Sequence, residues 1–176
     1  GTPGFSYSWS NGTTNQNINN LSDGTYFVTV SDSKGCTETS NITLTAPSAI
    51  TTSMTSTNPS CNGGTNGTAI VNASGGTAGY LYSWSTAPIQ TTSTATGLSA
   101  LTYTVTVTDS KNCTKTNIVT LTQPSALTAT VSSTKPSCNG GTNGTATVSA
   151  LGGTAGYTYS WSTTPAQTIS TVTDYL

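Results

Sequence analysis

The side chains that could carry out chemistry are few in this sequence, and two of them recur at matching positions. The chain has five acidic residues, no histidine and no arginine. Asp32 and Asp109 each lie in a segment that reads Ser/Thr-Asp-Ser-Lys. Acid-base or nucleophilic catalysis needs a second activating group nearby, and no second carboxylate recurs with either aspartate. We therefore predict no catalytic residue and interpret both aspartates as turn residues that bind their own backbone.

The sequence also offers few ligands for a metal ion and few positive charges for a nucleic acid. A calcium site needs a cage of several oxygen ligands, whereas each recurring segment offers one carboxylate. Without histidine, the four cysteines lack the usual mixed ligand set of zinc. Four lysines and a net charge of −1 leave no basic patch that could neutralise phosphates. We predict no metal, no cofactor and no nucleic-acid partner.

An internal repeat organises the whole chain. Pro59–Ala69 and Pro136–Ala146 have the identical sequence PSCNGGTNGTA, and their cysteines are 77 residues apart (138 − 61). The same spacing separates two further pairs of residues, namely Cys36 and Cys113, and Trp84 and Trp161. A fixed period of this length indicates tandem copies of one folding unit.

The repeat divides the chain into three parts. Residues 49–125 form a complete unit, residues 1–48 lack the first strands of a unit, and residues 126–176 lack its last strands. A natural terminus seldom bisects a folding unit, so we expect the chain to be a window of a longer protein with more copies on both sides. Short proline-containing joints, at 45–48 and 122–125, are expected to connect the units stiffly.

The pattern of apolar residues predicts an all-β fold. Tyr103, Val105 and Val107 alternate with threonines, which is the period of a strand with one buried face. Five further strands are predicted in the complete unit, around 50–54, 69–73, 80–84, 91–95 and 119–121. Glycine-rich turns separate them, and no segment has helical spacing. Six or seven short strands in one unit predict tandem immunoglobulin-like β-sandwich repeats that form an extended rod.

Two aromatic features refine this prediction. Tyr103 follows the segment Gly97–Thr102, which resembles the tyrosine corner of such sandwiches, in which the hydroxyl bonds back to the preceding loop. Trp9, Trp84 and Trp161 each end a row of alternating aromatic residues. We predict that these tryptophans fill the sandwich core, because the other apolar residues are small. The alternative is that the aromatic rows stack against sugar rings.

The cysteines are interpreted as one disulfide in each unit. If six strands run alternately up and down, the turn that holds Cys61 and the turn that holds Cys113 lie at the same end of the sandwich. We therefore predict a Cys61–Cys113 disulfide. The competing pair, Cys36 and Cys61, would cross a unit boundary and require two sandwiches to fold back on each other.

Three motifs in fixed order carry a resemblance to a known family. They are NLSDGTYFVTVSDSKGC at 20–36, SCNGGTNGTATV at 137–148 and GGTAGYTYSWS at 152–162. Together they resemble the SprB-type repeat of giant surface adhesins in gliding bacteria of the Bacteroidetes group. The resemblance implies a secreted, extracellular protein of the bacterial cell surface that is built from many such repeats and used in adhesion or gliding.

We therefore predict that the chain is a repeat segment of a cell-surface adhesin or fibre and acts as a structural spacer rather than an enzyme. The alternative function is a carbohydrate-binding module of a secreted protein. Neighbouring repeats of the same chain or fibre are the expected partners, with surface glycans as a further candidate. No apolar run approaches the roughly 20 residues needed to cross a membrane, so we predict no membrane insertion in this segment.

Overall fold

The structure is a computed structural model that describes residues 1–173. It consists of strands and loops, and within those residues it has no helix and hence none that could cross a membrane. The chain divides into two compact units, Gly1–Ala49 and Ile50–Leu176. The boundary between these two units falls between residues 49 and 50. The predicted division of the chain into three repeats stays a prediction. We call residues 1–48, 49–125 and 126–176 the first, complete and last repeat.

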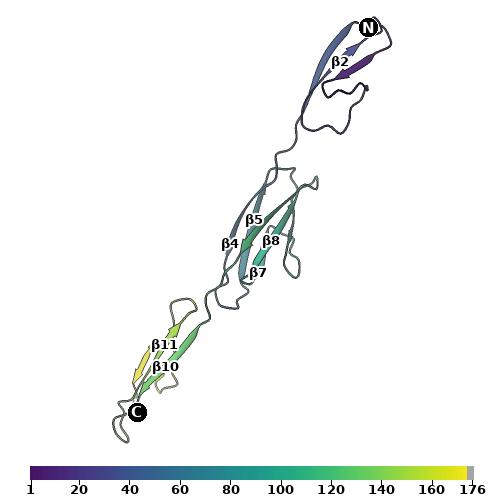
Figure 1. The fold of residues 1–176 in the computed structure, drawn as a ribbon. Helices are drawn as coiled ribbons and strands as arrows, with labels where there is room; N and C mark the ends of the chain where they lie inside the picture. The colour runs from purple at the N-terminus through teal and green to yellow at the C-terminus, as the bar shows by residue number, and fades with distance from the viewer. Residues whose placement is uncertain (174–176) are drawn as a thin grey trace. The chain divides into compact units, whose positions relative to one another are not determined.

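The complete repeat contains two three-stranded antiparallel sheets (Figure 1). One sheet has the order β4-β5-β7, with strands Thr51–Thr57, Gly67–Ser74 and Thr94–Leu98. The other has the order β6-β8-β9, with strands Leu81–Trp84, Thr102–Thr108 and Thr114–Thr120. All six predicted strands are present, and the fold is an all-β sandwich of the immunoglobulin-like kind.

The core lies between these two sheets, as the period of two requires. In β8, Tyr103, Val105 and Val107 are buried while the intervening threonines face outward and are partly exposed. Side chains of both sheets form one apolar cluster that includes Val71 of β5 and Trp84 of β6. Alternation therefore specifies which face of each strand is buried, and burial of that face stabilises the sandwich.

Successive strands of the complete repeat alternate in direction along the chain, except that β6 and β7 do not. β5 is antiparallel to both β4 and β7, and β8 is antiparallel to both β6 and β9. Side-chain hydrogen bonds show that β4 and β9 run parallel, because Asn117 donates to Thr52 and the backbone of Thr122 donates to Asn58. Consequently β6 and β7 run in the same direction, and the loop between them travels back along the sandwich without forming a strand.

β7 also lies further along the chain than its pattern predicted. The sequence places a short strand at 91–95 and a turn at Gly97, whereas the strand spans Thr94–Leu98 and includes the glycine. Gly97 has a φ of 69°, which glycine adopts without strain. The pairing of β7 with β5 shifts register between Gly67 and Ala69, so the ladder continues past the irregular residue.

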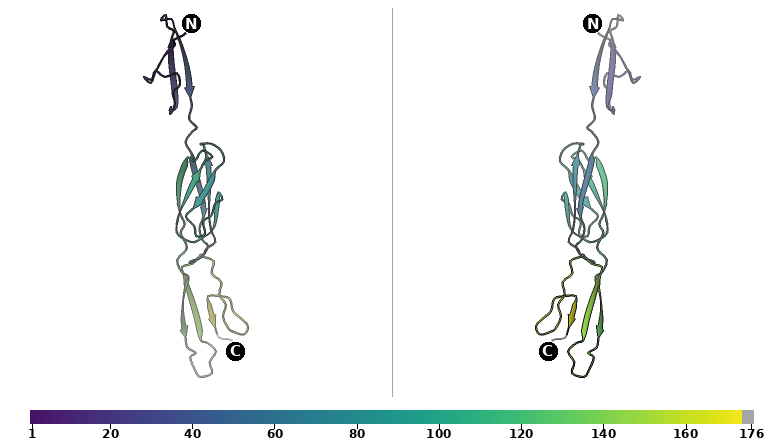
Figure 2. Two further views of the ribbon diagram at one scale, coloured as in Figure 1. Left: turned by 90° about the vertical axis from the view of Figure 1, so that its right-hand side faces the viewer. Right: turned by 90° about the vertical axis from the view of Figure 1, so that its left-hand side faces the viewer.

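The first and last repeats each contain a single sheet. In the first repeat the order is β1-β2-β3, with strands Ser6–Trp9, Gly24–Ser31 and Thr37–Leu44. In the last repeat it is β10-β11-β12, with strands Thr128–Thr134, Thr145–Leu151 and Thr171–Thr173. Figure 2 shows β10, β11 and β12 without a second layer of strands over them. One face of each of these sheets therefore lacks the partner that it has in the complete repeat.

Candidate functional site

Asp109 lies in the turn between β8 and β9, and its hydrogen bonds explain why an aspartate recurs at this position. One carboxylate oxygen, Oδ1, accepts the backbone N–H groups of Lys111 and Cys113, each at 2.9 Å. The other, Oδ2, accepts the N–H of Thr77 at 2.9 Å and so joins this turn to the loop before β6. These bonds favour the charged form, and the one from Thr77 contributes most to lowering the pKa of the buried Asp109 carboxyl. Asp109 therefore binds the backbone of its own turn, as predicted. Backbone N–H groups already occupy both of its carboxylate oxygens.

Asp32 repeats this arrangement in the first repeat. Its Oδ1 accepts the N–H groups of Lys34 and Cys36 at 2.9 Å, and its Oδ2 accepts that of Thr2 at 3.0 Å. The bond from Thr2 is the main cause of the lowered pKa of this carboxyl. Within residues 1–173 no group of three or more Cys, Asp or Glu side chains is placed to hold a metal ion. The recurring acids thus have a structural role in both repeats.

The predicted tyrosine corner at Tyr103 is formed, and a second corner is present in the first repeat. The Tyr103 hydroxyl accepts the N–H of Ser99 at 3.1 Å and lies 3.3 Å from the Ser99 carbonyl, to which it donates. In the first repeat, Tyr26 donates to the carbonyl of Ser22 at 3.2 Å. The corner fixes the loop that leads into β8 and thereby the register of the buried strand.

The joint after the complete repeat is held by four hydrogen bonds from loop 58–63. Asn58 donates to the hydroxyl of Thr122 at 3.0 Å and accepts its N–H at 3.0 Å. Asn62 donates to the carbonyl of Pro124 at 3.1 Å, and the Gln123 side chain accepts the N–H of Gly63 at 2.8 Å. The segment 122–124 is therefore fixed against its own repeat rather than free to swing.

The last repeat contacts the same loop. Thr154, in the loop after β11, donates through its hydroxyl to the carbonyl of Ser60 at 3.1 Å. The backbone N–H of Gly153 donates to the carbonyl of Ser125 at 2.8 Å. Loop 58–63, joint 122–125 and the 153–154 turn thus form one polar junction between consecutive repeats. We name this set of residues the junction.

Sequence reasoning did not identify the junction residues. Asn58, Asn62 and Gln123 are side chains of ordinary polar loops, and their partners lie about sixty residues away along the chain. One of these residues could have been noticed in the sequence, because Asn62 follows Cys61 and its match Asn139 follows Cys138. The other two do not recur, since Lys135 and Ala46 occupy the matching positions.

The predicted Cys61–Cys113 disulfide is not confirmed by the structure. All four cysteines are exposed free thiols. Cys61 follows β4 and lies at the end of the sandwich where β9 finishes, whereas Cys113 immediately precedes β9. The seven residues of β9 span about 23 Å, far beyond the roughly 7 Å that a disulfide can bridge between Cα atoms. The prediction assumed that the strands strictly alternate in direction, whereas β6 and β7 run in the same direction.

The aromatic rows differ between complete and incomplete repeats. Trp84 is 1% exposed and its indole N–H donates to the carbonyl of Thr92 at 2.9 Å, so it lies in the core and presents no face to a sugar. Trp9 and Trp161, at matching positions, are only partly buried. Within residues 1–173, neither tryptophan has the second sheet that covers Trp84 in the complete repeat.

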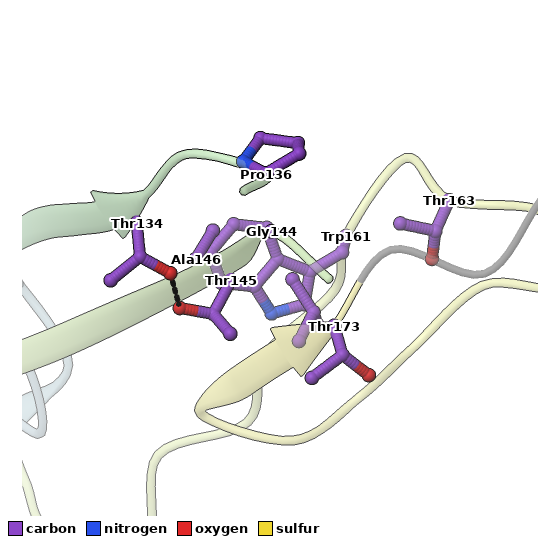
Figure 3. A pocket seen from close by; sticks show the side chains of 9 residues that line it. Thr134, Pro136, Gly144, Thr145, Ala146, Trp161, Thr163 and Thr173 are labelled. Atoms are coloured by element: carbon purple, nitrogen blue, oxygen red, sulfur yellow. Dashed lines mark hydrogen bonds between the residues drawn. The ribbon is translucent and has the colours of Figure 1, made fainter. Parts of the chain in front are cut away.

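Trp161 lines a hollow of about 310 Å³ on the open face of the last repeat. Figure 3 shows its indole pointing toward Ala146 of β11, with Pro136 and Gly144 along another wall and the Thr134–Thr145 hydrogen bond beside them. Two more hollows on this repeat, of about 310 and 290 Å³, share Val148. The open face is therefore apolar and unfilled along much of its length.

Comparison with known families decides what kind of repeat this is. The SprB repeat family matches residues 53–88 and 130–165, two segments offset by the same 77 residues (130 − 53) that separate the repeated cysteines. Both segments match the SprB repeat. The matched segments contain most of β4 and all of β5 and β6 in the complete repeat, and most of β10 and all of β11 in the last. The family resemblance inferred from the three motifs is confirmed.

Other comparisons add little to this assignment. The curated proteins include none that matches the chain. A solved structure, that of the amphioxus IgVJ-C2 molecule, is similar over 70% of this chain and 91% of that chain, with 14% identity and a TM-score of 0.36. SprB repeats occur in cell-surface adhesins, so this is in general terms a repeat segment of the adhesin type.

Proposed function

We propose that these SprB repeats act as a stiff spacer in a bacterial cell-surface adhesin or fibre and hold an adhesive part away from the cell in adhesion or gliding. The junction carries this proposal. Four hydrogen bonds fix segment 122–124 to loop 58–63, and Thr154 of the following repeat bonds to the same loop. A joint held in this way resists bending, which is what a spacer requires.

Location outside the cell and the absence of enzymatic activity belong to the same proposal. The repeat type occurs in surface adhesins, and residues 1–173 bring together no group of three or more Cys, Asp or Glu side chains that could hold a metal ion. Glycan binding receives no comparable support, because Trp84 is enclosed in the complete repeat. A glycan array with the full chain should therefore be silent, and specific glycan binding by the unmodified chain would favour the lectin alternative.

The stiffness of the junction can be tested by small-angle X-ray scattering, extrapolated to infinite dilution. The triple variant Asn58→Ala, Asn62→Ala and Gln123→Ala removes the side chains that fix the joint. We expect a smaller radius of gyration and a broader distance distribution than in the unmodified chain. Gln90→Ala is the matched control, because Gln90 bonds to Thr96 within the sandwich. A triple variant that scatters like the unmodified chain would contradict the spacer proposal.

A further inference from the structure

The first and last strands of the complete repeat are the ones through which the chain enters and leaves it. The chain enters at Ile50, directly before β4, and leaves at Leu121, directly after β9. Because β4 and β9 run parallel, these two points lie at opposite ends of the sandwich, which we call the entry end and the exit end. A pull on the two ends of the chain therefore draws β4 and β9 past each other along their length.

Buried side chains hold both of these points. Ile50 is 8% exposed and lies so close to Gly76 that a Cβ atom added there would meet Ile50 Cγ1 at 2.8 Å. Leu121 is 2% exposed and lies over Gly67. Drawing either side chain out of the sandwich exposes apolar surface to water, which costs free energy. The entry and exit points therefore transmit a pull to the strands instead of peeling away.

Side-chain hydrogen bonds link β4 and β9 at two levels. Near the entry end, Asn117 donates to the hydroxyl of Thr52 at 3.1 Å. Near the exit end, Asn58 donates to the hydroxyl of Thr122 at 3.0 Å and accepts its backbone N–H at 3.0 Å. The chain rises about 20 Å between Thr52 and Asn58, so the two levels are spread along the sandwich.

Two further bonds extend this link beyond the strands. Asn62 donates to the carbonyl of Pro124 at 3.1 Å, and the N–H of Gly63 donates to the side-chain oxygen of Gln123 at 2.8 Å. Loop 58–63 directly continues β4, so tension in segment 122–124 passes through these bonds straight into β4. The shortest path of the load thus leaves out β5 to β8.

We propose that these contacts form a mechanical clamp through which the complete repeat carries tension along the chain. The clamp consists of four residue pairs, Thr52–Asn117, Asn58–Thr122, Asn62–Pro124 and Gly63–Gln123. Its bonds lie side by side between segments that must slide past each other, so a pull loads them together. Bonds loaded together break in one step, and the rate of that step governs forced unfolding.

This load-bearing role goes beyond the proposed spacer function. Stiffness concerns bending of the joint at rest, whereas the clamp resists a pull along β4 and β9. A joint that bends freely in solution still loads the clamp when it is pulled straight. Scattering that contradicts the stiff spacer would therefore leave the clamp to be decided by pulling experiments.

The direction of pulling tests the clamp without changing the folded protein. In a full chain with Cys36→Ser, Cys61→Ser and Cys138→Ser, the exposed thiol of Cys113 serves as an attachment point. Cys113 directly precedes β9 and so lies at the entry end. Optical tweezers hold this chain either by its two termini or by its first residue and Cys113. The second arrangement separates β4 from β9 at one end, so their bonds break one after another.

We expect the complete repeat to unfold at a lower force when it is held through Cys113 than when it is held by its termini. With the termini held, the event is recognised by the release of residues 50–121, roughly 250 Å of fully extended chain. Equal unfolding forces in the two arrangements would overturn the proposal, because stability alone does not depend on the direction of the pull.

Removal of clamp side chains gives an independent test. With the termini held at constant force, the triple variant Asn58→Ala, Asn62→Ala and Gln123→Ala should unfold faster by a factor on the order of a hundred. Held through Cys113, it should begin to unfold at the force of the parent chain, because rupture then starts at the other end of β4. A triple variant that unfolds like the parent chain when pulled by its termini would contradict the clamp.

Gln90→Ala is the matched control for the triple variant. Gln90 forms two hydrogen bonds with the backbone of Thr96, away from β4 and β9. Its removal should leave the unfolding rate unchanged when the chain is pulled by its termini. An acceleration as large as that of the triple variant would show that any lost hydrogen bond has this effect, and the proposal would fall.

Discussion

Leu121 lies over Gly67 so closely that a Cβ atom added at position 67 would meet Leu121 Cδ2 at 2.6 Å. The same atom would meet the carbonyl oxygen of Leu98 at 2.7 Å, and that backbone group cannot move aside easily. Gly67 is thus required by close packing where β5, β7 and the end of β9 meet. At the matching Gly144 the nearest atom is 3.2 Å away, on the Pro136 ring.

Gly67→Ala should therefore destabilise the complete repeat by about 1–3 kcal/mol, which is typical of overpacking. Gly144→Ala should leave the unfolding of that repeat unchanged. The measurement is denaturant unfolding followed by Trp84 fluorescence in a chain that also carries Trp9→Phe and Trp161→Phe. Equal midpoints for the two alanine variants would contradict this interpretation of the Leu121 contact.

The parts of the fold that could be predicted are those with a regular local pattern of apolar residues. β8 could be predicted because Tyr103, Val105 and Val107 alternate with threonines, and each was found buried. The direction of β7 could not be predicted, because the returning loop before it has no periodicity. The junction was equally inaccessible, since the partners of Asn58 and Asn62 are set by how distant loops meet. The Cys61–Cys113 prediction depended on the direction of β7, which the sequence did not reveal.

Trp84 should contribute far more to stability than its match in the last repeat. Trp84 is 1% exposed and Trp161 is only partly buried. Trp84→Ala should cost about 3–5 kcal/mol because it leaves a large cavity, whereas Trp161→Ala should cost about 1 kcal/mol or less. Hydrogen exchange of the β8 amides Val105 and Val107 measures the effect of Trp84→Ala, and exchange of the β11 amide Val148 measures that of Trp161→Ala. Similar loss of protection in both variants would show that Trp84 does not anchor the core.

The Asp109 turn should make the complete repeat sensitive to acid. Hydrogen bonds from Thr77 and Cys113 hold the pKa of this carboxyl below its ordinary value of 3.8. A folded pKa below the unfolded one means that the charged group stabilises the fold above pH 3.8 and that this contribution is lost as the pH falls through the folded pKa. The Trp84 unfolding midpoint should therefore drop on acidification in that range.

Asp109→Asn supplies the control for this pH dependence. The variant should be less stable at neutral pH, because the charged acceptor of three backbone N–H groups is replaced, and its midpoint should change less between pH 5 and pH 2. Asp32→Asn changes the matching turn of the first repeat and should leave the Trp84 transition unaffected. An unchanged acid response in Asp109→Asn would assign the effect to another carboxyl.

The last prediction concerns the cysteines of the complete repeat. Because β9 separates Cys61 from Cys113, mild oxidation of the folded monomer at high dilution should yield no peptide in which these two are linked. Oxidation after unfolding in denaturant should yield that peptide, since the unfolded chain brings distant thiols together. Peptide mapping under non-reducing conditions distinguishes the two samples. Recovery of the linked peptide from the folded chain would require β9 to detach from β8, and hydrogen exchange of β9 would then be fast.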